Sequence, residues 1–346
     1  MNEPANEPAN EPAGSSDRRA EPPPATPATP AASADGVRDP DSGPEGTIYD
    51  LGYKRYLGTR LPQSSRWRVI MRQQLSFAWK TWWRFKVPMI GALIATVVGG
   101  AVMYVWADTV MGMLGRRGAD VQAGPGAMVV RFLDGIVPLS VLWYCKLGFI
   151  ASLTVAAQVV AADIRTGALT FYFARPVRPL DYVLGKAAGL FVLAGVLVGV
   201  GPVLLTLFQL GLSGSTAQLV AKLPNVGYAA LIGLLSTLVY SVVPLGFSAL
   251  VPDRRWAVGL WALYYVAFGS IMTALGNAVW QPLAALDLVT ALTRISMSLF
   301  DVTFVHSAPF AIGWGIASVV LHAVAALALV SWRVTSAAHQ GVGGMS

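Results

Sequence analysis

Few residues of this chain have the types and spacing that catalysis or metal binding needs. Its three histidines, His306, His322 and His339, are far apart, and its one cysteine, Cys145, lies within an apolar run. This set offers no metal-ligand spacing and no disulfide. No GxxxxGK[ST] phosphate loop occurs, and the glycine-containing segment 115–120 lacks the Lys-Ser/Thr ending that reaches phosphate and magnesium. We therefore expect no metal, no cofactor and no nucleotide site within this chain.

A serine nucleophile is the enzyme chemistry that the residues still allow. Gly211-Leu212-Ser213-Gly214 resembles the GxSG motif of rhomboid proteases, and His322 lies in a later apolar run where it could act as a base. Glycine and serine also explain an ordinary loop at Ser213. The residues around His322 lack the small-residue pattern that brings rhomboid helices close together. An intramembrane serine protease using Ser213 and His322 stays open as an alternative.

Lys146 is a charged residue near the middle of a long apolar run. A lysine at the centre of a membrane span costs about 2.5 to 3.5 kcal/mol on insertion scales, so its ammonium should face protein, an aqueous cavity or a partner subunit. We interpret Lys146 as a candidate residue of a substrate route. The alternative is that its long side chain reaches the outer membrane interface.

The overall composition indicates an integral membrane protein. Hydrophobic residues make up 55% of the chain and charged residues 12%, whereas about 25% of an ordinary soluble domain is charged. The net charge is +7, but the basic residues cluster beside apolar runs, as topology determinants do, and we expect no nucleic-acid partner. Residues 1–46, which begin with three NEPA repeats, contain few large apolar residues and predict a disordered cytoplasmic tail.

Six apolar runs predict an all-α fold with six transmembrane helices in a domain over residues 87–335. Each run reaches about 20 residues, enough to cross a hydrocarbon core of about 30 Å. A short cytoplasmic tail, 336–346, should follow. The runs cover residues 87–107, 137–162, 187–212, 226–250, 256–275 and 311–332.

Two further segments should lie at the membrane surface. Residues 47–86 predict a cytoplasmic segment that leads into an amphipathic helix, because tryptophans recur among arginines and lysines in its second half. Residues 276–309 are apolar but interrupted by charges, and predict one or two short re-entrant helices before the last span. The tryptophans of the expected interfacial helix are Trp67, Trp79, Trp82 and Trp83.

The placement of lysine and arginine predicts the orientation in the membrane. With a cytoplasmic amino terminus, sixteen basic residues flank the spans on the inner side and five lie in the outer loops. Basic residues are enriched on the cytoplasmic side of membrane proteins. Both termini should therefore be cytoplasmic, although Arg116 and Arg117 form a local exception. The loop 163–186 between the second and third spans is then cytoplasmic.

This loop carries a distinctive pattern. An acidic residue ends the second span, a short helix is expected over 166–173, an Arg-Pro turn follows, and Gly185-Lys186 opens the third span. The pattern resembles that of type-2 permeases of ATP-binding-cassette (ABC) exporters. The departures are an aspartate where glutamate is usual and Pro179 after Arg178. The matching residues are Asp163, Gly167, Ala168, Leu169, Ala174, Arg175, Pro176, Val177, Gly185 and Lys186.

The resemblance implies a transport subunit without an ATPase site, located in the bacterial plasma (inner) membrane. Its loop would form a coupling helix seated on a separate ABC ATP-binding subunit, which would hold the ATP and magnesium. A second permease subunit, identical or homologous, would complete a dimer in the lipid bilayer. The residues expected to couple to the ATPase subunit are Asp163, Arg165, Thr166, Gly167, Leu169, Phe171, Tyr172, Arg175, Pro176 and Arg178.

In this interpretation Leu169, Phe171 and Tyr172 are apolar anchors for a pocket of the ATPase subunit, with Arg175 and Arg178 as charges at the rim. A plain cytoplasmic loop is the simpler alternative for this segment. A second alternative, for the whole chain, is a membrane scaffold or assembly protein that reuses the permease fold without moving a substrate. The sequence leaves the transported substrate unidentified.

Overall fold

The chain is helical throughout the part that its computed structural model describes, residues 65–117, 125–174, 177–302 and 310–343. The expected tail 1–46, the segment 47–64, and Arg175 and Pro176 lie outside the described residues. The helices are α1 (Arg66–Lys80), η2 (Trp82–Lys86), α2 (Val87–Arg117), α3 (Pro125–Thr154), α4 (Val159–Arg165), α5 (Ala168–Phe173), α6 (Pro179–Ala194), η3 (Gly195–Gly199), α7 (Val200–Gly211), α8 (Thr216–Lys222), α9 (Pro224–Leu250), α10 (Arg254–Leu263), η4 (Tyr264–Phe268), α11 (Gly269–Ala278), η5 (Gln281–Leu286), α12 (Leu288–Leu299) and α13 (Ile312–Gly343).

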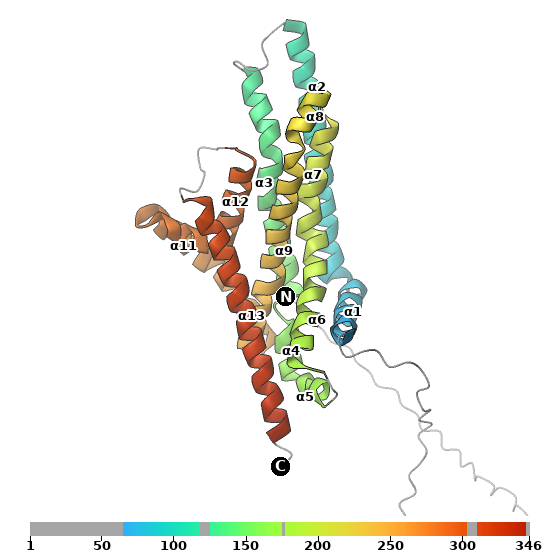
Figure 1. Ribbon diagram of the computed structural model, residues 1–346, viewed down its shortest axis with the longest axis vertical. Helices are drawn as coiled ribbons and strands as arrows, with labels where there is room; N and C mark the ends of the chain where they lie inside the picture. Colours follow the sequence, from blue (N-terminus) through green and yellow to red (C-terminus); the bar gives the residue numbers. More distant parts are fainter. Residues whose placement is uncertain (1–64, 118–124, 175–176, 303–309, 344–346) are drawn as a thin grey trace, which may run out of the picture. The chain divides into compact units, whose positions relative to one another are not determined.

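Within these residues, six continuous helical segments are long and apolar enough to cross a membrane, which confirms the six predicted spans (Figure 1). Several of them combine more than one of the helices above, because a π-helical turn or a short break interrupts the α-helix. The six segments are Trp83–Thr109, Arg131–Arg165, Pro179–Gly211, Thr216–Leu250, Arg254–Ala278 and Ile312–His339.

Helix α9 forms the centre of the bundle. It packs against α3, α6, α7, α10, α12 and α13, and most of its second half is buried. The close approach to α13 depends on Gly246, where an added Cβ would lie 2.7 Å from the Cβ of Ala326. Small residues allow membrane helices to approach closely.

The second span is broken between α3 and α4. Ala156 and Ala157 both donate their backbone N–H groups to the carbonyl of Ser152, so the chain makes a wide turn there. The hydroxyl oxygen of Ser248 on α9 accepts the N–H groups of Val160 and Ala161, each at 3.0 Å. Buried backbone donors need such a partner in the absence of water. Ser248 thus stabilises the start of α4.

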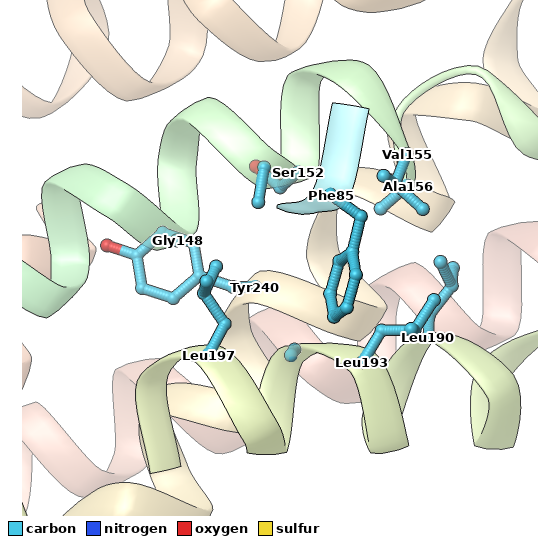
Figure 2. A pocket seen from close by; sticks show the side chains of 11 residues that line it. Phe85, Gly148, Ser152, Val155, Ala156, Leu190, Leu193, Leu197 and Tyr240 are labelled. Carbon is cyan, nitrogen blue, oxygen red and sulfur yellow. The ribbon is translucent and has the colours of Figure 1, made fainter. Parts of the chain in front are cut away.

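The side chain of Phe85 enters the bundle beside this break. Figure 2 shows its ring between Ser152, Val155 and Ala156 on one side and Leu190 and Leu193 on the other. A small cavity of about 20 Å³ remains there, which is roughly the size of one water molecule. The first, second and third spans therefore meet around one aromatic residue next to the break.

Helix α1 packs against the first part of α6. Ile70, Gln74 and Ala78 are the buried residues of α1, and they lie on one face because they are spaced by four residues. Two glycines of α6 make room for them. A Cβ added at Gly185 would lie 2.7 Å from both the Cβ of Ile70 and the carbonyl oxygen of Trp67, and one at Gly189 would lie 2.9 Å from the Cβ of Gln74.

The expected tryptophan stripe borders this buried face. Trp67 is half-buried, and Trp79 and Trp83 are exposed. Trp82 begins η2. The fully buried side chains of α1 are thus those of Ile70, Gln74 and Ala78, and neither Trp67 nor Trp79 is among them.

The segment before the last span contains two short helices, η5 and α12, within the residues 276–309 where one or two were expected. Asp287 separates them. Its carboxylate accepts the backbone N–H of Val289 and the hydroxyl groups of Thr273 and Thr290. An aspartate at a helix N-cap stabilises the first turn in this way.

Candidate functional site

The loop between the second and third spans folds into the short helix α5 (Figure 1). Gly167 separates α5 from α4, because its φ of 67° places it in the left-handed region, where only glycine is unstrained. Helix α5 therefore starts at Ala168, two residues later than the expected start at Thr166. It packs against α4 and the last part of α13. We call the end of the bundle that carries α1, α4 and α5 the α5 end.

A buried ion pair joins the two ends of this loop. The Nζ of Lys186 lies 2.9 Å from the Oδ2 of Asp163, and the side chains are only 9% and 18% exposed. The hydroxyl of Tyr182 donates a 2.7 Å hydrogen bond to the same carboxylate oxygen. Because a buried charge needs such partners, the pair and the tyrosine fix the end of α4 to the first half of α6.

The three apolar residues expected as anchors of α5 point in different directions. Leu169 is 5% exposed and packs in the chain's own core with Tyr182, Val330 and Val334. Tyr172 is half-buried, stacks edge-on against Tyr182, and donates its hydroxyl to Gln73 of α1 at 3.4 Å. Phe171, at 75% exposed, is the member of this trio that is presented outward.

The polar residues of the loop lie mostly at its surface. Arg165, Thr166 and Arg178 are exposed. The hydroxyl of Thr166 donates to the carbonyl of Ala162 at 2.9 Å. The backbone N–H of Arg178 donates to Asp181, which caps the start of α6. Arg165 and Arg178 therefore leave their guanidinium groups near α5 without an ion pair among the described residues.

A hollow of about 460 Å³ lies beside Phe171, lined by Gln73, Ala168, Phe171 and Tyr172. Burial, followed by the nearby Asp163 carboxylate, raises the pKa of Tyr172. Its phenol therefore stays protonated at neutral pH and can donate to Gln73. The floor of the hollow is thus a neutral, hydrogen-bonded surface, and its exposed rim contains a large aromatic side chain.

Lys146 lies on the outside of the bundle rather than in its core. Its Nζ is 4.5 Å from the ring centroid of Trp143, which is also exposed. A cation over an indole face is stabilised by the ring quadrupole. The two residues form an amphipathic patch in the second span, twelve and fifteen positions after Arg131, where that span begins.

Ser213 and His322 do not form a pair. Both ring nitrogens of His322 have other neighbours: Nε2 contacts the hydroxyl of Tyr264, and Nδ1 contacts the hydroxyl and carbonyl oxygens of Ser318. Ser213 follows the end of α7, and its hydroxyl has no hydrogen-bond partner among the described residues. The protease alternative therefore lacks its serine-histidine contact in this structure.

The Asp163–Lys186 contact was not foreseen from the sequence, although both residues were noted at the ends of the loop. A signal was present, because a carboxylate and an ammonium each stand at the end of an apolar span. Their pairing depends on how α4 and α6 cross, which one sequence does not state. The acceptor role of Ser248 had no signal beyond a serine in an apolar run.

Comparison with protein-family models gives no match, and a search of curated proteins gives no significant match either.

Proposed function

We propose that this chain is the membrane permease subunit of a type-2 ABC transporter that exports a substrate. The observation that supports it best is the outward presentation of Phe171 on a short helix that is held firmly from behind. Leu169 and Tyr172 attach α5 to the bundle, and the Asp163–Lys186 pair joins the helices on either side of it, α4 and α6. A displacement of Phe171 by a partner would therefore move α5 as a unit and would be transmitted to the second and third spans.

The proposed partner at this surface is an ATP-binding subunit. An exposed aromatic residue such as Phe171, with exposed arginines such as Arg165 and Arg178 in the same loop, is typical of an interface anchor with a charged rim. The chain has no phosphate loop of its own, so the ATP and magnesium would be held by that partner. The α5 end would face the cytoplasm, as the distribution of basic residues predicts.

The same proposal includes a second permease subunit. Lys146 and Trp143 are exposed on the single chain although they lie well inside a candidate membrane span. A charged residue at that depth is costly against lipid and is expected to face protein or water. A second copy, or a homologous subunit, would cover this patch and form the substrate route between the two.

The test is the variant Phe171→Asp, expressed with the ATP-binding subunit. A charge at an aromatic anchor should cost at least about 2 kcal/mol of binding free energy, so the complex should dissociate at least about 30-fold more readily. Membrane insertion should be unchanged, because Phe171 makes little contact with the rest of the chain. Co-purification of the ATP-binding subunit and ATP-driven transport are the measurements.

Val220→Asp is the matched control. Val220 is also an exposed apolar residue of a short helix, at 66% exposed, but it belongs to α8, which packs on α7 and α9. Helix α8 lies at the other end of the bundle from α5 (Figure 1). The control should keep the ATP-binding subunit. Normal co-purification and normal transport with Phe171→Asp would contradict the proposed coupling role. Retained co-purification with no transport in the unaltered protein would favour the scaffold alternative.

A further inference from the structure

A second hollow at the α5 end lies deeper than the one beside Phe171. It has a volume of about 320 Å³ and is formed by α1, η2, the broken second span, α5, α6 and α10. This volume is at the lower end of the range typical of small-molecule sites, roughly 300 to 1,000 Å³. The cavity is therefore large enough for a polar head group but not for a bulky substrate.

The charges around this cavity are predominantly positive. Three basic side chains, Arg84, Lys186 and Arg254, and one carboxylate, Asp163, line it. Lys186 and Asp163 neutralise each other. Among the described residues, Arg84 and Arg254 form no ion pair and no side-chain hydrogen bond. Two guanidinium groups are thus left to attract an anion, and guanidinium binds phosphate oxygens in a bidentate manner.

Both arginines are held in place by their backbones. The hydroxyl of Thr154 donates to the carbonyl oxygen of Arg84 at 2.9 Å, which ties η2 to the break in the second span. Arg254 starts α10, where the carboxylate of Asp253 caps the helix by accepting the N–H of Arg255 at 2.7 Å. The backbone of each arginine is therefore fixed at the cavity, with the Arg84 side chain half-buried and the Arg254 side chain exposed.

The depth of the two arginines points to a membrane component. Arg84 is the second residue of the first span, and Arg254 is the first residue of the fifth. Both therefore lie where a span leaves the hydrocarbon core, at the level of the lipid phosphates. Basic pockets between membrane helices at this level are suited to anionic lipid head groups.

The remaining wall is amphipathic. Phe77, Val155 and Val159 supply apolar surface, and Gln73 and Gln158 supply amide groups. A free inorganic anion would gain nothing from the apolar part. A lipid can place its phosphate between the arginines and its glycerol and upper acyl carbons against the apolar residues. Two uncompensated positive charges also favour a lipid with net negative charge over a zwitterionic one.

We propose that this cavity binds the phosphate diester of an anionic glycerophospholipid, with Arg84 and Arg254 as the two phosphate ligands. The inference needs only the assignment of the spans and not the ATP-driven function proposed above. It extends that proposal, because Asp163, Thr166 and Tyr172 of the coupling loop share the same cavity. A bound lipid would then support the loop from behind.

The test measures binding of phosphatidylglycerol to the purified full chain in mild detergent by native mass spectrometry. Arg84→Gln with Arg254→Gln should weaken binding at least about tenfold, which corresponds to about 1.4 kcal/mol. Arg84→Lys with Arg254→Lys keeps both charges and should retain more affinity than the glutamine pair. The control is Arg68→Gln with Arg72→Gln, two exposed arginines of α1 that do not line the cavity, and it should bind normally.

Four results would overturn the proposal. If the α1 control lost as much affinity for phosphatidylglycerol as the Arg84→Gln, Arg254→Gln variant, general surface charge would explain the binding. Displacement of phosphatidylglycerol by inorganic phosphate as effectively as by more phosphatidylglycerol would assign the cavity to a free anion. Equal binding of phosphatidylcholine and phosphatidylglycerol by the unaltered chain would contradict the selectivity for anionic lipid that the two arginines are proposed to provide. This comparison does not depend on whether the glutamine variant folds. If the Arg84→Gln, Arg254→Gln variant lost the ATP-binding subunit but bound phosphatidylglycerol as before, the cavity would be assigned to an acidic segment of that subunit.

Discussion

At the residue scale, the contrast between two ion pairs shows where charge contributes to stability. Lys186 and Asp163 are buried with Tyr182 as a third partner. Lys222 and Asp134, near the other end of the bundle, lie 2.7 Å apart but are about a third exposed. Burial removes solvent screening and raises the free-energy cost of leaving one charge unpaired. Breaking the first pair should therefore lower the stability of the fold much more than breaking the second.

Lys186→Met should therefore destabilise the fold by about 3 kcal/mol, because it leaves the Asp163 carboxylate buried beside Tyr182. Adding Asp163→Asn should restore most of the loss, since the amide oxygen can still accept from Tyr182. Lys222→Met should cost about 1 kcal/mol or less. Thermal unfolding of the three variants in detergent checks this order. A double variant no more stable than Lys186→Met alone would contradict the pairing.

At the element scale, α1 depends on two glycines of the neighbouring span. Gly185→Ala would put a Cβ 2.7 Å from the Trp67 carbonyl oxygen and the Ile70 Cβ. The helices would have to separate, at a cost of about 1 to 3 kcal/mol. Gly259→Ala, in α10, meets nothing within 4 Å and should be neutral or stabilising by up to about 1 kcal/mol.

Trypsin cleavage at the arginines of α1 measures this difference. Gly185→Ala should speed cleavage at Arg68 and Arg72, because α1 is released from α6. In the Gly259→Ala variant, trypsin should cleave these two sites at the same rate as in the unaltered chain. Identical rates for both variants would show that α1 does not rely on contact with α6.

The elements differ in how far the sequence could predict them. The six spans follow from long apolar runs, which only helices can satisfy in a membrane. Their observed boundaries differ from the expected ones by up to ten residues, at the start of the fourth span. The inward position of Leu169 could not be predicted, because a six-residue helix with apolar residues on most sides has no decisive periodicity. The break after Thr154 depends on Ser248, which is far along the chain. Such features come from tertiary contacts.

At the scale of the whole molecule, two exposed features divide the proposed function between them. Phe171 marks the α5 end, where energy would enter from an ATP-binding subunit. Lys146 and Trp143 mark the outside of the second span, where a second permease subunit would lie. Both surfaces belong to the same span and its loop, and the break between α3 and α4 lies between them. A movement of α5 would therefore reach that break before it reached the part of the span that contains Lys146.

The most direct test uses a single cysteine at position 171. Cys145 is the only native cysteine and is buried, so Cys145→Ala with Phe171→Cys gives one reactive thiol at the α5 surface. A cysteine-directed photo-crosslinker should join it, in native membranes, to a protein that contains a GxxxxGK[ST] phosphate loop. Cys145→Ala with Val220→Cys should give no such product. Equal crosslinking from both positions, or none from position 171 in an assembled and active complex, would contradict the account.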